Sequence, residues 1–246
     1  MGQYYRPVIL GNRNAIKGYF YSHHYDNGLK LMEHSYLNNN FVGAVMQYLN
    51  ENGGARLVWA GDYADNEKGK DENLYSLTSS LEDKDGKVIR KEKPEIIVEE
   101  KCDQEKLHLI INDDKKEFIN LWHIKGLDTY PIHPLPLLTA EGNNRGGGDY
   151  CGTNMKLVGS WARDFIRVES GDWSASNKLM ESGYKEINPL FVEDRTVFRA
   201  TETLFNAIRD LREHGCFSDD DLVRIQDAVK EIKKIPNTTP YYANLD

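Results

Sequence analysis

Short runs of apolar and aromatic residues alternate with turns near the start of the chain. Residues 3–11 are rich in aromatic and β-branched side chains, and residues 19–21 repeat this composition after an Asn-rich turn, which predicts a β-hairpin. From residue 38 onward the apolar positions change to helical spacing, with asparagines that can cap the start and glycines at 53–54 that can end it. The sequence therefore predicts a hairpin, one amphipathic helix and then a short apolar strand at 55–59.

The middle of the chain, residues 81–126, mixes strand-like segments with many Lys and Glu residues. Strands are predicted at 87–90, 107–111 and 118–124, with an Asp-Gly turn before the first of them. The alternation and the high charge indicate solvated antiparallel strands. We therefore expect a strand-rich insertion at about 81–126 within the core fold.

Three prolines, Pro131, Pro134 and Pro136, precede a short apolar run. Proline lacks a backbone N–H and disfavours helix, so an extended connection or an edge strand is expected here. Further along, residues 165–169 alternate as a half-buried strand, and residues 184–191 contain one more short extended piece.

The last part of the chain changes to a helical pattern. Two apolar stripes recur at helical spacing, and they consist of Leu204, Ile208 and Leu211 and of Leu222, Ile225, Val229 and Ile232. Gly215 ends the first stripe, and Ser218 with Asp221 three residues later is typical of a capped start for the second. The pattern predicts an αα-hairpin at about 201–235.

These elements predict an α+β fold in two parts. Residues 1–195 are expected to form a core with a mixed or antiparallel sheet and a few helices, and residues 196–246 the helical hairpin and a tail. A strand followed by Gly-Asp and an aromatic residue occurs at 58–64 and again at 168–174. Gly-Asp after a strand is ordinary turn chemistry, so this echo is either a duplicated unit, with two lobes facing a shared cleft, or coincidence.

Composition narrows the cellular setting. With 39% hydrophobic and 28% charged residues, the 246-residue chain has the composition of a folded globular protein. We find no apolar run of about 18 residues and no signal-peptide pattern, and three widely spaced cysteines fit a reducing compartment. We therefore expect a cytoplasmic protein. Its net charge of -8 argues against a membrane partner and against bulk nucleic acid.

A glycine-rich segment carries the clearest chemical signal in the chain. Consecutive glycines let the backbone approach a ligand closely and can direct successive N–H groups at an anion, and an arginine directly precedes them. The segment is neither a dinucleotide-binding fingerprint nor a Walker loop, because no Lys-Ser/Thr pair follows it. A tight loop that needs positive φ angles is the alternative interpretation. The predicted ligand-binding residues are Arg145, Gly146, Gly147, Gly148, Asp149, Tyr150 and Trp161.

The candidate catalytic residues are two aspartates and one histidine. Asp62 follows a predicted strand, where functional carboxylates are often placed, and Asp149 lies at the end of the glycine-rich segment. If the two loops meet, Asp62 and Asp149 could act as acid and base; turn or helix-capping roles are the alternative. His34 belongs to a group of histidines and carboxylates at 23–34 whose spacing matches no zinc pattern, so we predict no metal site.

Five separated motifs give the chain a resemblance to other sequences. They are MGQYY at 1–5, GLKLMEHS at 28–35, WAGDYAD at 59–65, GNNRGGGDY at 142–150 and VGSWA at 158–162. In these motifs the chain resembles an uncharacterised family of bacterial and bacteriophage proteins that begin MGQYY, with the similarity ending at about residue 190, before the helical hairpin. The resemblance implies a bacterial or phage setting and supplies no catalytic residue. Where the family often has W-A-G-D, this chain has Arg163, which argues against a role that needs a flexible glycine there.

Three hypotheses of function follow from the sequence. The leading one is binding of a phosphorylated or otherwise anionic small molecule, such as a nucleotide, in a cleft between the loops at 61–62 and 145–149. The second is a phage-type interaction protein, an anti-defence inhibitor of a host enzyme, that acts through its acidic surface and the C-terminal hairpin. The third is a hydrolase that uses Asp62, Asp149 or His34. The sequence does not indicate a cofactor.

Overall fold

The computed structural model describes most of the first 191 residues. The described residues are 3–78, 95–99, 106–124, 132–142, 150, 152–171, 173–187 and 191. The chain divides into two compact units, Met1–Val192 and Glu193–Asp246, and every described residue belongs to the first. The strand expected at 87–90 and the helical hairpin expected at 201–235 lie outside the described residues, so both stay predictions.

A mixed sheet forms the centre of the described part of the chain. Its nine strands are β1 (Tyr5–Leu10), β2 (Ile16–Tyr19), β3 (Ala55–Gly61), β4 (Glu95–Ile96), β5 (Leu107–Asn112), β6 (Glu117–Asn120), β7 (Ala140–Glu141), β8 (Phe165–Ser170) and β9 (Lys185–Glu186). The strand order is β4-β2-β1-β3-β8-β5-β6-β9, and β7 pairs with β3 beside this path. Antiparallel pairing dominates, with parallel pairs at β2/β4, β3/β7 and β6/β9. The predicted α+β class with a mixed sheet is confirmed.

Helices in the described segments are short except for two. The α-helices are α1 (Leu31–His34), α2 (Asn40–Glu51), α3 (Leu74–Thr78), α4 (Pro134–Leu138) and α5 (Trp173–Glu181). Four single turns of 3-10 helix are η1 (Asn12–Asn14), η2 (Ser22–Tyr25), η3 (Leu121–His123) and η4 (Met155–Leu157). No helix of the described segments is both long and apolar enough to cross a membrane.

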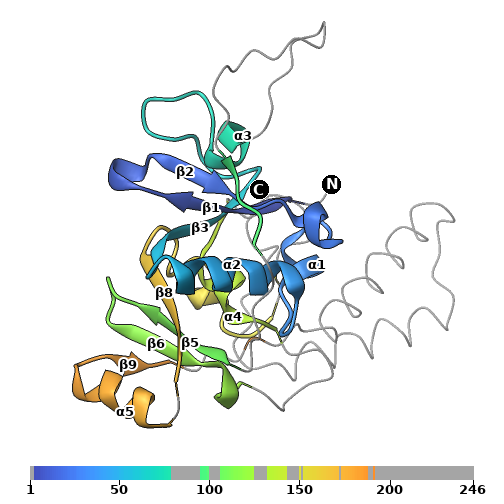
Figure 1. Cartoon of the computed structure of the whole chain (residues 1–246). Helices are drawn as coiled ribbons and strands as arrows, with labels where there is room; N and C mark the ends of the chain where they lie inside the picture. Colours follow the sequence, from blue (N-terminus) through green and yellow to red (C-terminus); the bar gives the residue numbers. More distant parts are fainter. Residues whose placement is uncertain are drawn as a thin grey trace, which may run out of the picture. The chain divides into compact units, whose positions relative to one another are not determined.

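Two halves of the sheet meet at a short junction. Strands β3 and β8 pair only through Ala55 with Ile166 and Arg56 with Phe165. One face of both halves packs on the main core, where α2 contributes Phe41 and other buried residues. Helix α2 therefore lies across the junction and packs against both halves (Figure 1).

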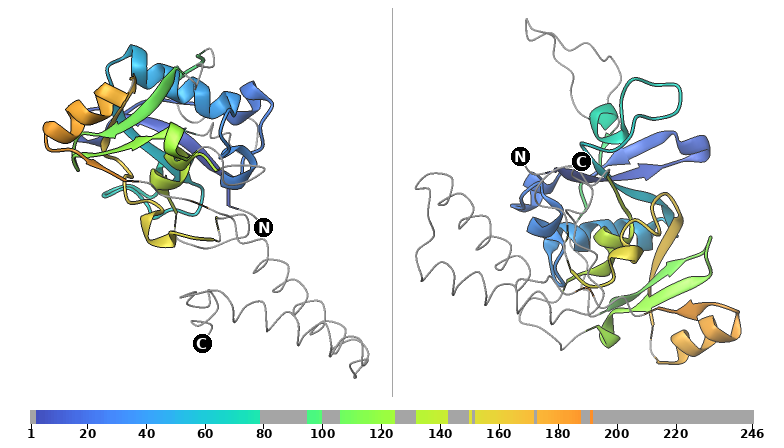
Figure 2. Two further views of the ribbon diagram at one scale, coloured as in Figure 1. Left: turned by 90° about the horizontal axis from the view of Figure 1, so that it is seen from below. Right: turned by 180° about the vertical axis from the view of Figure 1, so that it is seen from behind.

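The opposite face of the sheet carries two separate apolar clusters. Helix α3 contributes Leu74 to a cluster with Val8 and Val58 from β1 and β3. Helix α5 packs against β5 and β6 through Ala175 and Leu179. Figures 1 and 2 show α3 and α5 at opposite ends of the sheet. The face between them is left to polar side chains, which are described below.

Several predicted elements are present. The hairpin is β1 with β2, and the predicted helix is α2. Asn39 caps α2, because its side chain accepts hydrogen bonds from the backbone amides of Phe41 and Val42 at 2.9 and 3.2 Å. The strands expected at 55–59 and 165–169 are β3 and β8.

The prediction of an extended proline segment is wrong at 134–138, which forms α4. Pro134 occupies the first turn of this helix, where a missing N–H removes no intrahelical hydrogen bond. His133 caps the helix, since its Nδ1 accepts a hydrogen bond from the amide of Leu135 at 3.2 Å. Proline therefore starts a helix here, and all five residues of α4 are buried.

The prediction of solvated strands at 107–111 and 118–124 is also wrong. All six residues of β5 are buried, because β5 lies between β8 and β6 with apolar clusters on both of its faces. Residues 117–120 form β6, whereas residues 121–123 turn into the short helix η3. Both strands thus belong to the main sheet.

Candidate functional site

Strands β3 and β7 end side by side at one edge of the sheet. They run parallel, with Trp59 opposite Ala140 and Ala60 opposite Glu141, so the residues that follow each strand leave in the same direction. A Cβ atom on Gly61 would lie 2.9 Å from the carbonyl oxygen of Glu141. Both Gly61 and Gly142 leave room for the buried side chain of Gln3, and larger residues would overlap it. The segments that start at Asp62 and at Gly142 therefore begin as neighbours.

Asp62 is held firmly at the end of β3. Its amide donates a hydrogen bond to the carbonyl oxygen of Tyr4 at 2.9 Å, and its Oδ1 accepts one from the amide of Tyr4 at 3.0 Å. Asn73 donates to the carbonyl oxygen of Asp62 at 2.9 Å. Partial burial raises the pKa of the Asp62 carboxyl, while hydrogen bonds from the amides of Tyr4 and Tyr63 oppose this rise. Asp62 is thus a half-buried carboxyl group that hydrogen bonds hold in one position.

An arginine lies close by on the same face of the sheet. Asp62 stands opposite Tyr4, and Arg6 stands opposite Ala60, so Arg6 and Asp62 point to one face because strand side chains alternate. The Arg6 guanidinium carbon lies 4.2 Å from the ring centroid of Tyr75. We call the group of Arg6, Tyr19, Tyr21, Tyr75 and Thr78 the Arg6 cage.

The Arg6 cage surrounds its cation with rings and one hydroxyl group. The guanidinium carbon lies 5.0 Å from the ring centroid of Tyr19 and 5.8 Å from that of Tyr21, and Nη1 donates to Thr78 Oγ1 at 3.1 Å. Burial raises the pKa of Tyr75 and of Tyr19, and the Arg6 charge opposes both rises. Arg6 is only 7% exposed, and among the described residues no carboxylate lies within ion-pair distance of it. This cation is therefore buried without a described counter-charge.

Arg163 links the two neighbouring segments to each other. Its Nε and Nη2 each lie 2.6 Å from a carboxylate oxygen of Glu141, the last residue of β7. Its Nη1 donates to Glu67, in the segment after β3, at 3.1 Å, and its Nη2 contacts the same carboxylate. The two carboxylates raise the pKa of Arg163. We call Arg163, Glu67 and Glu141 the Arg163 clamp, because it joins the segment after β3 to the end of β7.

The backbone of Arg163 is held in an uncommon conformation. Its φ is 69°, in the left-handed region that favours glycine. Its amide donates a hydrogen bond to Leu57 of β3 at 2.8 Å. The conformation at this position is therefore one that glycine adopts more readily than arginine. The arginine uses this conformation to form the clamp.

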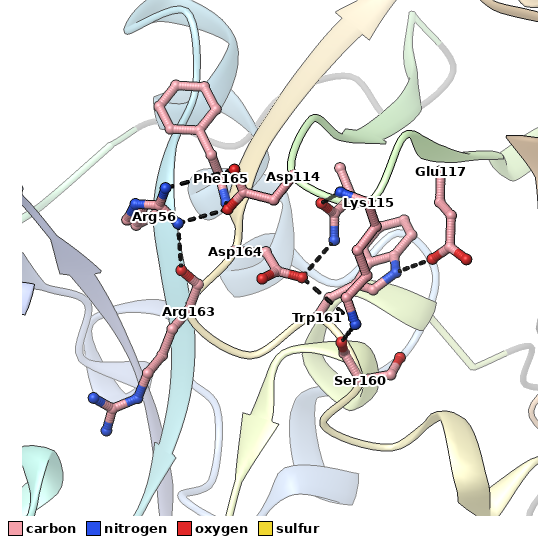
Figure 3. A network of polar contacts seen from close by, with 10 residues as sticks. Arg56, Asp114, Lys115, Glu117, Ser160, Trp161, Arg163, Asp164 and Phe165 are labelled. Atoms are coloured by element: carbon pink, nitrogen blue, oxygen red, sulfur yellow. Dashed lines mark hydrogen bonds and ion pairs between the residues drawn. The ribbon is translucent and has the colours of Figure 1, made fainter. Parts of the chain in front are cut away.

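A second polar network lies between α3 and α5, beside the junction of β3 with β8. Figure 3 shows Arg56 of β3 donating to Asp114 at 2.6 Å and to the carbonyl oxygen of Arg163 at 3.0 Å. The hydrogen bond from Arg56 lowers the pKa of Asp114. Lys115 Nζ lies 3.8 Å from Asp164 Oδ2. These contacts connect the turn between β5 and β6 to the segment before β8, so we assign them to the stability of the junction.

Trp161 and Tyr150, two of the predicted ligand-binding residues, are buried. Trp161 is 0% exposed, and its Nε1 donates to Glu117 at 2.8 Å (Figure 3). The Tyr150 hydroxyl donates to the carbonyl oxygen of Thr153 at 2.8 Å, and its ring packs edge-on against Phe191. Both side chains are part of the main core.

His34, the predicted catalytic histidine, lies inside the core. Its Nδ1 donates to the carbonyl oxygen of Gly28 at 3.2 Å, which leaves Nε2 to accept a hydrogen bond from Trp59 Nε1 at 2.9 Å. Burial lowers the pKa of His34 to about 4. His34 is thus a neutral, fully buried ring with both nitrogens hydrogen-bonded, and it stabilises the core. It contacts Trp59, which points to the face of β3 opposite to that of Asp62, so His34 and Asp62 lie on different sides of the sheet.

The remaining predicted residues, Arg145, Gly146, Gly147, Gly148 and Asp149, lie outside the described residues. The pairing of Asp62 with Asp149 as acid and base therefore stays a prediction. What the described part adds is the start of the segment, Gly142, beside Gly61.

Sequence reasoning missed Arg6, Glu67 and Glu141. For Arg6 the signal was present, because alternation along the strand at 3–11 places Arg6 on the same face as Val8. A charged residue at an apolar position of a strand indicates a special role. For the Arg163 clamp no local signal exists, since its members are 96 and 22 residues apart from Arg163.

Comparison with known proteins adds no relative. No family model, no curated protein and no solved structure matches the chain. Within the described segments, no group of three or more His, Cys, Asp or Glu side chains is arranged to hold a metal ion.

Proposed function

We propose that the protein binds an anionic small molecule, such as a phosphorylated compound, at the edge of the sheet where β3 and β7 end. The observation that carries the proposal is the parallel pairing of these strands, which starts the glycine-rich segment beside Asp62. Ligands of α/β proteins commonly bind outside the carboxyl ends of parallel strands, where the loops that follow the strands come together.

The expected roles follow from the chemistry of each group. Backbone amides of Gly146 to Gly148 and the charge of Arg145 bind the anionic group. Asp62 accepts a hydrogen bond from a hydroxyl or amino group elsewhere on the ligand, through the carboxylate oxygen Oδ2. The Arg163 clamp keeps the two segments together while the ligand enters and leaves. The resemblance to bacterial and bacteriophage proteins suggests a bacterial or phage-infected cytoplasm as the setting.

Native mass spectrometry of the protein as purified from cells tests this proposal. We expect the wild type to carry a non-covalently bound mass that is absent from Arg145→Ala and from Gly147→Val. Arg13→Ala is the matched control, because Arg13 is an exposed arginine of the hairpin turn. Wild-type protein that carries no bound mass and gains no thermal stability from phosphate or nucleoside phosphates would contradict the proposal.

A hydrolase is the second candidate function, and the raised pKa of Asp62 favours it. A carboxyl group that keeps its proton to higher pH is better suited to act as a general acid. Asp62→Asn should then abolish turnover of a bound phosphate ester while leaving its binding intact. The phage-type inhibitor of a host enzyme depends on residues 196–246, and its test is deletion of that segment followed by a binding assay with bacterial enzymes.

A further inference from the structure

Arg6 enters an apolar face of the sheet. All six residues of β1 are buried, and Val8 and Leu10 belong to the cluster beneath α3. Arg6 shares their face because it lies two residues before Val8. Arg6 is therefore a permanent positive charge on a face of the sheet where Val8 and Leu10, the next residues of β1 on that face, are aliphatic.

The contacts of Arg6 leave its charge only partly satisfied. Its Nη1 donates to Thr78, which is a neutral acceptor that itself contacts the carbonyl oxygens of Leu74 and Tyr75. Its buried Nε has no hydrogen-bond acceptor among the described residues. Buried charged side chains are almost always paired or hydrogen-bonded at each donor. Within the described part of the chain, Arg6 departs from this rule twice, because it has no counter-charge and its Nε donor is unused.

The tyrosine rings offset part of this cost. Cation–π contacts favour a guanidinium over an aromatic face within about 6 Å, and three rings of the Arg6 cage meet that limit. An aromatic ring is a poor acceptor for the Nε hydrogen bond. An oxyanion is a good one, because a planar guanidinium can donate to two of its oxygens at once. Tyr21 and Tyr75 are only partly buried, so the cage extends to the surface.

We infer that Arg6, in addition to the groups named above, binds the anionic group of the ligand, a compact oxyanion such as a phosphate or a carboxylate, at the Arg6 cage. This inference rests on the proposed function, because the cage lies on β1 beside the end of β3, where the ligand is expected to bind. The oxyanion supplies both the counter-charge and the acceptor for Nε. Asp62 on the same face excludes a second negative group, so the rest of the ligand is neutral or carries a hydrogen-bond donor.

Thermal unfolding of the full chain in sodium phosphate, compared with sodium chloride at equal ionic strength, tests the inference. We expect phosphate at ten times its dissociation constant to raise the wild-type Tm by about 3 °C or more. Arg6→Met should lose this rise and be at least as stable as the wild type in chloride, because the variant no longer buries an unpaired charge. Arg13→Met removes an exposed arginine and should respond as the wild type does. Sodium acetate in a parallel series distinguishes a carboxylate site from a phosphate site.

The outcomes separate this inference from the proposed function. If Arg6→Met is less stable in chloride and keeps the full phosphate response, Arg6 is structural and the inference is wrong. If only Arg145→Ala loses the phosphate response, the proposed function stands and the role of Arg6 is wrong. If only Arg6→Met loses it, Arg6 binds the anion and the role of the glycine-rich segment is wrong. Absence of any response to both anions in the wild type contradicts both. If Arg6→Met does not fold, Arg6→Lys decides, since lysine keeps the charge, lacks Nε and should weaken phosphate binding at least tenfold.

Discussion

Replacing Arg163 with glycine has two opposite effects on the free energy of unfolding. At φ 69° a residue with a side chain is strained by about 1 kcal/mol relative to glycine, so the variant gains that amount. The same change removes the guanidinium that joins Glu67 to Glu141. The stability of the variant therefore measures whether the Arg163 clamp exceeds the strain of the backbone that forms it.

The contacts of the clamp set the expected magnitude. A hydrogen bond to a charged group contributes about 1.5–3 kcal/mol. The Arg163 side chain is 26% exposed, so we take the lower value for each of the two carboxylates, which gives about 3 kcal/mol in total. After subtraction of the relieved strain, Arg163→Gly should lower the free energy of unfolding by about 2 kcal/mol and the Tm by about 4–8 °C.

Urea unfolding at pH 7 measures this difference. Arg13→Gly is the matched control, because Arg13 is exposed, has φ 56° and makes no ion pair among the described residues, so its change reports strain relief alone. Adding Glu67→Gln and Glu141→Gln to Arg163→Gly should recover part of the loss, since the two carboxylates no longer repel each other. An Arg163→Gly variant as stable as the wild type would refute the reasoning.

Three further predictions concern the core. Burial lowers the pKa of His34 to about 4 and of His133 to about 3 from the ordinary 6.5, so the unfolded chain takes up these protons first as the pH falls. The free energy of unfolding should fall by about 3–4 kcal/mol between pH 7 and pH 5 from these two groups together, and His34→Gln should halve that contribution in urea titrations at each pH. Trp59→Phe removes the donor to His34 Nε2 and should cost about 2–4 kcal/mol by the same assay; a loss below about 1 kcal/mol would contradict the buried hydrogen bond. Asn39→Ala removes the cap of α2 and should cost about 1 kcal/mol, seen as a lower urea midpoint at an unchanged slope.

Local patterns predicted the elements that local physics decides. Alternating apolar residues identified β1 and β3, and capping asparagines with helical spacing identified α2. The wrong predictions concern segments whose secondary structure or burial depends on a residue's position within an element or on its tertiary surroundings. Pro134 disfavours a helix interior and suits a first turn, and the sequence does not say which position it takes until His133 is seen to cap it. The strand β5 is buried because α2 and α5 cover it, and those contacts are non-local.

The candidate site could be predicted only in part. Asp62 was identified as a residue after a strand, whereas its neighbours depend on pairings between distant segments. The parallel pair β3/β7 joins residues about 80 positions apart in the chain, and no periodicity indicates it. His34 drew attention through its residue type, but the structure uses it as a buried hydrogen-bond partner of Trp59. Arg6 could have been found from strand alternation alone, had its face been compared with that of Val8.

The short junction between β3 and β8 bears on how the protein opens. Only two residue pairs of β3 and β8 are in register there, and the other ties between the two groups of strands are the packing of α2, the contacts of Arg56 and the backbone hydrogen bonds of Leu57 with Arg163 and Asp164. Amide protons in the two groups of strands should therefore exchange with solvent as two separate cooperative units. While α2 remains packed on the sheet, the amide protons of each group of strands should exchange at that group's own rate. Asn39→Ala, which weakens α2, should increase the difference between the two exchange rates. The sheet is continuous by pairing but is expected to behave as two neighbouring units that share one helix.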